Sequence, residues 1–144
     1  MYKRILVPTD GSDVTSKAVD TAIGLARALG AQLETLSVKE PFPYSAMSEI
    51  QPIAPQEYFE AQEQIAQRRV QKVVDVCRAA GLECAALTLE AVHPWEAIIE
   101  HAKAGACDLI VMASHGRRGM RALLLGSETQ RVLVHSTVPV LVVR

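Results

Sequence analysis

Short apolar runs alternate with helical patterns along this chain, and that alternation constrains the fold more than any other feature. The expected strands are Ile5–Val7, Leu33–Val38, Cys84–Leu89, Leu109–Met112 and Val138–Val143. Strands that alternate with helices form a parallel sheet with helices on both faces, and right-handed crossovers make the sheet doubly wound. The sequence therefore predicts a doubly wound α/β fold.

Helix signals separate the expected strands. After the first strand, apolar residues recur at helical spacing between Ala18 and Leu29, and Gly30 is a stop signal. The other helices are expected over Gln56–Ala80, Pro94–Ala104 and Glu128–His135. The stretch from Lys39 to Pro55 is rich in proline and serine, which predicts an irregular loop.

Size and composition indicate that residues 1–144 form one compact domain. A chain of 144 residues buries a substantial core, and 49% of the residues are hydrophobic. The net charge of −1 argues against a broad nucleic-acid or membrane surface. No apolar run approaches the length of a transmembrane helix, and Met1–Arg4 leads directly into the first strand, so we expect no signal peptide.

Cysteine and histidine usage favours a reduced protein without a structural metal. The three cysteines are widely spaced and form no Cys-x-x-Cys pair, and the four histidines show no metal-ligand spacing. Isolated cysteines of this kind usually behave as small hydrophobic residues in a reducing compartment. We therefore expect a cytoplasmic protein.

The segment Ala113–Ser127 links the fourth strand to the last helix and carries the strongest binding signal. Glycine, here at Gly116 and Gly126, lets the backbone approach a ligand closely. Ser127 lies at the expected start of a helix, where unpaired N–H groups and the helix dipole favour an anion. Positive charge nearby comes from Arg117, Arg118 and Arg121. This combination predicts a phosphate site.

The same segment also has a purely structural interpretation. Gly126 and Ser127 followed by Gln130 form the pattern of a capping box, and exposed arginines are common in solvated loops. The segment is no Walker loop, because no Gly-Lys-Ser/Thr follows its glycines. It also comes too late in the chain for the first-turn dinucleotide fingerprint. On the local pattern alone, both interpretations stay open.

The position of the glycine segment in the predicted fold favours the phosphate-binding interpretation. Ligands of doubly wound folds lie at the carboxyl ends of the strands, where the winding reverses. The turn Thr9–Gly11 follows the first strand and the glycine segment follows the fourth, so both lie at that edge. If these two strands are neighbours, the two loops share one crevice that suits a nucleotide.

The chain resembles the ATP-binding branch of the universal stress protein family over nearly its whole length. The matching stretches are Ile5–Ser12, Asp108–Met112, Leu124–Ser127 and Val138–Val143. The resemblance implies a five-stranded parallel sheet in the order 3-2-1-4-5. It also implies that the chain binds ATP together with magnesium or manganese.

The family's nucleotide motif is a glycine, two residues, a glycine, nine residues, a third glycine, and a serine or threonine. Gly116, Gly126 and Ser127 match its last three positions and would hold the phosphates. Ala113 occupies the first glycine position and adds a methyl group, whose cost depends on the local φ angle. A second departure is Val92, where the family often has glycine.

The resemblance implies further roles near the first two strands. Asp10 would lie near the ribose or a phosphate-bound metal, although a helix-capping acceptor is an alternative role. Pro8 and Thr9 would shape the adenine pocket, and Val38 would contact adenine. The complete set of expected nucleotide contacts is Pro8, Thr9, Asp10, Val38, Met112, Ala113, His115, Gly116, Arg117, Gly126 and Ser127.

Three functions compete. The first is an ATP-binding regulatory protein with at most slow hydrolysis, because Asp10 and His115 are the only nearby general-base candidates and neither has an evident partner. The second is a nucleotide-free stress adaptor that acts through protein partners, against which the retained glycines count. The third is a flavodoxin-like electron carrier, which an aromatic content of only 4% disfavours.

The last strand suggests an oligomer. Val138–Val143 is strongly apolar, and the implied strand order places it at a sheet edge. An exposed apolar edge invites pairing, and a two-fold partner satisfies the same edge on both subunits. Many family members dimerise through this strand, so we expect a homodimer; the alternative is a monomer whose loops or helices shield the edge.

Overall fold

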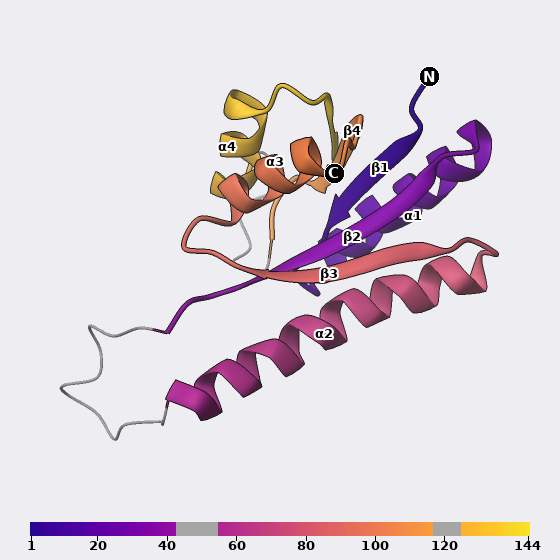
Figure 1. Ribbon diagram of the computed structural model, residues 1–144. Helices are drawn as coiled ribbons and strands as arrows, with labels where there is room; N and C mark the ends of the chain where they lie inside the picture. The colour runs from indigo at the N-terminus through magenta and orange to yellow at the C-terminus, as the bar shows by residue number, and fades with distance from the viewer. Residues whose placement is uncertain (43–54, 117–124) are drawn as a thin grey trace.

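The computed structural model contains one five-stranded parallel sheet in the order β3-β2-β1-β4-β5 (Figure 1). It describes residues 1–42, 55–116 and 125–144. The strands are β1 (Arg4–Pro8), β2 (Gln32–Lys39), β3 (Cys84–Glu90), β4 (Leu109–Ala113) and β5 (Val140–Val143). The helices are α1 (Asp13–Leu29), α2 (Pro55–Ala79), α3 (Pro94–Ala104) and α4 (Ser127–His135). The predicted α/β fold and strand order are confirmed.

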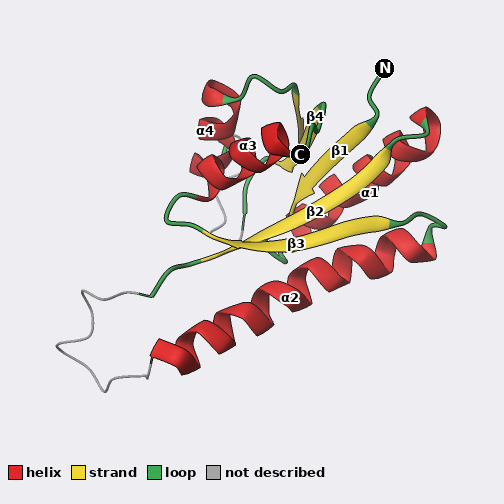
Figure 2. Cartoon of the chain, in the orientation of Figure 1, coloured by secondary structure: helices red, strands yellow, loops and turns green. Residues whose placement is uncertain are grey.

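The helices cover both faces of the sheet (Figure 2). Because side chains of a strand point alternately to opposite faces, β1 contributes to two cores. Ile5 and Val7 pack with α1 and α2, whereas Leu6 packs with α3 and α4. All three side chains are fully buried. This burial on both faces explains why the strand is a continuous apolar run rather than an alternating one.

β1 and β4 lie side by side at the centre of the sheet. Ile5 is paired with Leu109, and Leu6 with Ile110. The chain leaves β1 toward α1 on one face and leaves β4 toward α4 on the other. The first and fourth strands are therefore neighbours at the point where the winding reverses, as the sequence analysis required for a shared crevice.

The predicted end of α1 at Gly30 is confirmed, and Ser12 is the N-cap of this helix. The Ser12 side chain accepts a hydrogen bond from the Thr15 N–H, which otherwise has no partner at a helix start. Gly30 adopts the left-handed conformation, with φ of 67°, and its N–H donates to the Ala26 carbonyl. Glycine adopts this conformation without steric cost, which ends the helix here.

The predicted capping box of α4 is wrong. The helix begins at Ser127, so Gly126 is the N-cap, and no side chain caps this end within the described residues. Contacts with the end of β4 fix this start: the Gly126 N–H donates to the Ser114 carbonyl at 2.7 Å, and the Thr129 hydroxyl donates to the Ala113 carbonyl at 2.9 Å. The helix therefore starts one residue before the position that the box required.

The last strand is shorter than expected and begins at Val140 rather than Val138. The Ser136 hydroxyl donates to the Val138 carbonyl and accepts from its N–H, which holds this residue in a local turn. Pro139, which has no N–H, follows and accepts from Ile110 through its carbonyl. Ladder pairing starts only after the proline.

Part of the predicted loop after β2 and part of the predicted phosphate loop lie outside the described residues. These parts are residues 43–54 and 117–124, and the second includes Arg117, Arg118 and Arg121. In the ranges that the structure describes, none of the helices has the length and apolar character needed to cross a membrane.

Candidate functional site

The turn after β1 is built by short polar side chains. The Thr9 N–H donates to the Leu36 carbonyl at 2.9 Å, which keeps the turn attached to β2, and the Thr9 hydroxyl accepts from the Gly11 N–H at 3.1 Å. Gly11 has φ of +80°, a conformation that side chains rarely allow. The turn therefore directs the chain from the sheet edge into α1, with Thr9 buried beneath it.

Asp10 lies at the start of α1 and its two carboxylate oxygens have different surroundings. The Oδ1 atom accepts from the Ser12 N–H at 2.9 Å and from the Thr15 hydroxyl at 2.8 Å. The Oδ2 atom lies against Gly116. Asp10 therefore supports the helix start, as the alternative interpretation held, although Ser12 is the N-cap. It also reaches the loop after β4.

The loop after β4 is fixed by hydrogen bonds to two neighbouring elements. The buried Ser114 donates its N–H to the Val143 carbonyl of β5 at 2.8 Å and accepts the Gly126 N–H at 2.7 Å through its carbonyl. Its hydroxyl lies 3.1 Å from Nδ1 of His115. Ser114 therefore positions both the last strand and the start of α4, a role that the sequence analysis missed.

Gly126 lies close to the loop after β4. A Cβ atom built on Gly126 would lie 3.1 Å from the Cα atom of His115 and 3.5 Å from the Ser114 carbonyl oxygen. Its φ of −63° is available to any residue, so close packing rather than backbone conformation requires glycine here. Gly126 thus brings the open end of α4 against the loop that follows β4.

The two loops converge at Asp10 and Gly116. A Cβ atom built on Gly116 would overlap Oδ2 of Asp10. The structure therefore brings together the turn after β1, the loop after β4 and the first residues of α4, where Ser127 is exposed. A helix N-terminus without a side-chain cap offers N–H donors and a positive dipole to an anion.

Ala113, in the position that the family motif gives to glycine, has a backbone that tolerates its methyl group. Within the described residues, the one non-glycine residue with positive φ is Ala106. Ala113 therefore has an ordinary backbone conformation, as the last residue of β4, where it is paired with Val143. The departure from the motif costs no backbone strain at this position.

The residues expected around adenine lie at the ends of β1, β2 and β4. Val38 packs at the edge of the core on the α3 side, and Met112 is buried in that same core with 7% of its surface exposed. The side chain of Met112 is therefore part of the core, so a ligand at this edge would contact its backbone. Pro8 ends β1 opposite Leu36. Arg117 lies outside the described residues.

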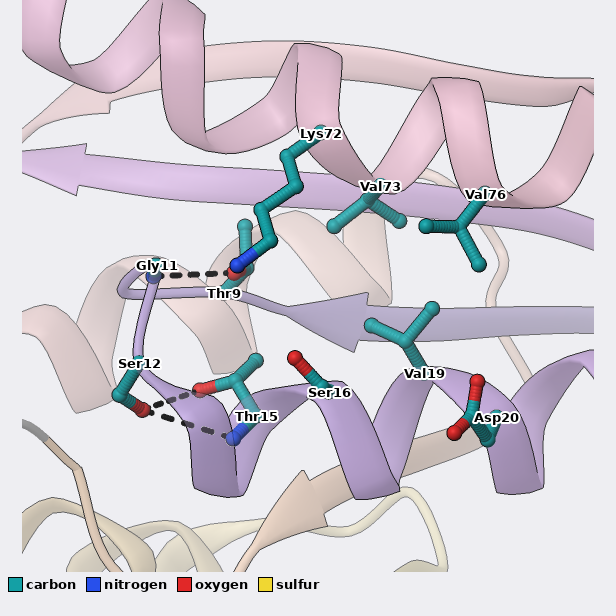
Figure 3. A pocket seen from close by; sticks show the side chains of 10 residues that line it. All are labelled: Thr9, Gly11, Ser12, Thr15, Ser16, Val19, Asp20, Lys72, Val73 and Val76. Atoms are coloured by element: carbon teal, nitrogen blue, oxygen red, sulfur yellow. Dashed lines mark hydrogen bonds between the residues drawn. The ribbon is translucent and has the colours of Figure 1, made fainter.

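A small recess lies on the other side of the β1 turn, between α1 and α2 (Figure 3). Its volume is about 40 Å³, with Val19, Val73 and Val76 among its lining residues, and Lys72 extends from α2 toward Thr9 (Figure 3). A volume of this size holds about one water molecule. The recess is therefore too small for a nucleotide, although it shares Thr9 with the residues expected to contact one.

Sequence reasoning also missed Thr129, which ties α4 to the carbonyl of Ala113. Thr129 is buried, with 4% of its surface exposed. A threonine three residues after a cap glycine is the only sequence signal for this contact, and it is too common to be diagnostic. Glu128, next to it, accepts the Trp95 N–H at 2.9 Å and so links the starts of α3 and α4.

The described residues contain no group of three or more side chains suited to hold a metal ion. A divalent cation at this edge would therefore take most of its ligands from phosphate oxygens and water, as magnesium commonly does. Oδ2 of Asp10 is the carboxylate oxygen that lies beside Gly116 at this edge. The residues present thus fit a metal that arrives with a nucleotide better than a resident metal.

The comparisons with known proteins point to one family. The model of the universal stress protein family matches residues 1–144. The universal stress protein MJ0531 of Methanocaldococcus jannaschii is 34% identical over 149 aligned residues, which cover all of this chain and 83% of the relative.

Two solved structures resemble the fold closely. The hypothetical protein MJ0577 superposes with a TM-score of 0.83 at 26% identity, over 99% of this chain and 96% of the other. A universal stress protein in complex with cAMP superposes with a TM-score of 0.73 at 26% identity, over 99% and 97% of the two chains. These matches are to universal stress proteins and their fold, so the flavodoxin-like interpretation receives no support.

Proposed function

This chain belongs to the universal stress protein family, and we propose that it binds an adenine nucleotide at the carboxyl ends of β1 and β4. The proposed ligand is ATP with magnesium or manganese. The observation that carries the proposal is the contact between Asp10 and Gly116, which joins the two loops into one site. The structural relative in complex with cAMP supports an adenine nucleotide as the ligand class.

The phosphates are proposed to lie at the start of α4. Gly126 provides no side-chain cap, and Ser127 is exposed at the first helical position. Backbone N–H groups at this position would donate to phosphate oxygens, and the helix dipole would stabilise their charge. The absence of a β-carbon on Gly116 and Gly126 keeps the surrounding loops close together. Arg117 is proposed to add a cation from the segment that follows Gly116.

Adenine is proposed to lie toward the end of β2, between Val38 and the turn at Pro8 and Thr9. Val38 is partly buried at the margin of an apolar core, which suits the face of a base. The backbone of Met112 and Ala113 borders the same edge. A metal ion bound to the phosphates is proposed to lie near Asp10, whose carboxylate reaches the loop after β4 at Gly116.

The role is proposed to be regulatory, with slow hydrolysis at most. A general base must lie within reach of its proton and be held ready to accept it. Nδ1 of His115 is engaged with the Ser114 hydroxyl, and Oδ1 of Asp10 is occupied at the start of α1. Both groups are proposed to hold the two loops in place rather than to activate water, so the proposed role is a nucleotide-dependent switch.

A homodimer through β5 is part of the proposal. β5 is an edge strand, and Leu141 exposes 38% of its surface. Leu133 and Val134 on α4 expose 40% and 77%. Pairing two copies of this edge would cover apolar surface on both. A cytoplasmic location is proposed from the three free cysteines, which suit a reducing compartment.

Isothermal titration calorimetry with ATP, with and without magnesium, tests the nucleotide site. We expect saturable binding by the wild-type protein and weaker metal-dependent binding by Asp10→Asn. Asp20→Asn is the matched control, because Asp20 is an exposed carboxylate on α1, the helix that follows Asp10. An absence of binding at millimolar ATP would refute the proposal and favour the nucleotide-free adaptor.

A further inference from the structure

A groove of about 510 Å³ lies between α3 and the end of β3, where its lining residue Leu89 is paired with Val38 of β2. β3 is the edge strand of the sheet opposite β5. The groove is lined by the end of β3, the connection to α3 and one side of α3. None of the residues expected to contact the nucleotide lines it. The groove is therefore a separate surface that the proposed function leaves unexplained.

The groove has an apolar floor. Ala97 is buried and Leu89 is partly buried. Val92 at the rim exposes 71% of its surface, one of the largest exposed fractions among the apolar residues described. Val92 together with Leu89 and Ala97 gives the groove an apolar side on which an apolar side chain of another molecule could pack.

The rim of the groove is acidic. Glu90, Glu96 and Glu100 line it and are exposed, and its ten lining residues include no lysine or arginine. The ion pairs Lys39–Glu63 and His101–Glu34 do not involve any of these three carboxylates. His101 also lines the groove, but its Nε2 is engaged with Glu34 at 2.9 Å.

We propose that this groove docks a basic, partly apolar segment of a partner protein. Lysine or arginine side chains of the segment would meet Glu90, Glu96 and Glu100, and an apolar side chain would cover Val92 and Leu89. Complementary charge would speed association and select against acidic partners. The proposed role gives the protein a protein-binding surface lined by none of the residues expected to contact the nucleotide.

Fluorescence anisotropy with a labelled peptide of leucine and lysine tests the proposal. We expect saturable binding that weakens as salt is added, because exposed charge pairs are screened. The double variant Glu96→Lys/Glu100→Lys should bind roughly tenfold more weakly. The double variant Glu57→Lys/Glu60→Lys is the matched control, because it makes the same change in net charge on exposed positions of α2.

A second pair of variants tests the apolar contact. Val92→Ser should weaken binding about threefold, because it removes apolar surface from the rim without disturbing the core. Val76→Ser on α2 is its control, since Val76 is an exposed valine, at 39%, outside the groove and outside the proposed dimer edge. Circular dichroism of each variant establishes that the fold is retained.

Several results would overturn the proposal. One is a lack of saturable peptide binding. Another is an equal loss of peptide affinity in the groove double variant and the α2 double variant. A third is equally tight binding of a peptide in which glutamate replaces lysine. Equal effects of the two valine variants would also place the peptide elsewhere. Titrations of the same variants with ATP separate this surface from the nucleotide site, because Glu96→Lys/Glu100→Lys should leave ATP affinity unchanged.

Discussion

Asp10 and Gly116 lie against each other although one follows the first strand and the other follows the fourth. No side chain fits between them: a Cβ atom on Gly116 would overlap Oδ2 of Asp10. The carboxylate has little freedom to move away, because Oδ1 is held by the Ser12 N–H and the Thr15 hydroxyl. The contact fixes the distance between the turn after β1 and the loop after β4.

Gly116→Ala should therefore weaken nucleotide binding. The added methyl group pushes the Asp10 carboxylate away and separates the two loops, so we expect roughly a tenfold loss of ATP affinity by calorimetry. Gly24→Ala on α1 is the control, because a Cβ there meets nothing within 4 Å. That variant should keep its affinity and gain up to about 1 kcal/mol of stability. Equal affinity of both variants would contradict the role of this contact.

Gly126→Ala should reduce stability as well as binding. The added Cβ would lie 3.1 Å from Cα of His115, which is backbone and moves only with the loop. Crowding of this kind costs about 1–3 kcal/mol, so urea denaturation should show a lower free energy of unfolding. Gly126→Val should cost more, so valine at this position does not test binding alone. Ser127→Ala, at an exposed site, should keep full stability and lower only ATP affinity.

Ala113→Gly should leave ATP affinity unchanged and lower stability. Ala113 does not have a positive φ, so glycine relieves no strain. Glycine within a strand costs about 0.5–1 kcal/mol relative to alanine, because the unfolded chain gains freedom. Thermal denaturation and calorimetry on the same samples measure both quantities. A marked gain in affinity would show that the methyl group obstructs the nucleotide.

Leu141→Lys should shift the protein from dimer to monomer in light scattering at tens of micromolar. The substitution places a charge on the apolar edge strand β5, where Leu141 exposes 38% of its surface. Val76→Lys on α2 is the control, because Val76 is exposed to a similar 39% but lies away from β5. A wild-type monomer at this concentration would rule out the proposed dimer.

Glu63→Gln should destabilise the protein at neutral pH but much less in acid. The hydrogen bond from Lys39, helped by those from Gln67 and Thr88, lowers the pKa of Glu63 from 4.5 to about 2. Because the folded pKa is lowered, the stabilisation is present above about pH 4.5 and disappears as the pH falls toward 2. Its size should stay below about 1 kcal/mol, because the Glu63 side chain is 38% exposed and solvent screens it.

Urea denaturation of wild type and Glu63→Gln between pH 2 and 7 measures this effect. The difference in unfolding free energy should shrink as the pH falls. Lys39→Met removes the main cause of the lowered pKa and should flatten the pH dependence of that difference. An unchanged difference across the range would show that the ion pair contributes nothing measurable.

The order and type of the elements follow from the sequence because their signals are local. Gly30 ends α1 through its own backbone freedom, and Pro94 begins α3 because its fixed φ suits a first turn. Apolar runs such as Leu109–Met112 likewise predict buried strands from their own residues alone. With these signals in place, the α/β class and the region of the site were predictable.

Only tertiary structure decided the exact starts of the last two elements. Gly126 rather than Ser127 caps α4, because hydrogen bonds to Ala113 and Ser114 fix the start of the helix from outside. β5 begins after Pro139, where pairing with β4 becomes possible. Each boundary depends on a partner that is distant in the sequence, which no local pattern encodes.

The geometry of the proposed nucleotide site and of the groove beside α3 also depends on packing between distant segments. The overlap that forbids a side chain at Gly116 exists only because β1 and β4 are paired, which places Asp10 beside it. The carboxylates of Glu90 and Glu96 share a groove only because the end of β3 and α3 form its walls. Residue types specify which groups are available, whereas strand pairing and helix packing decide which of them meet.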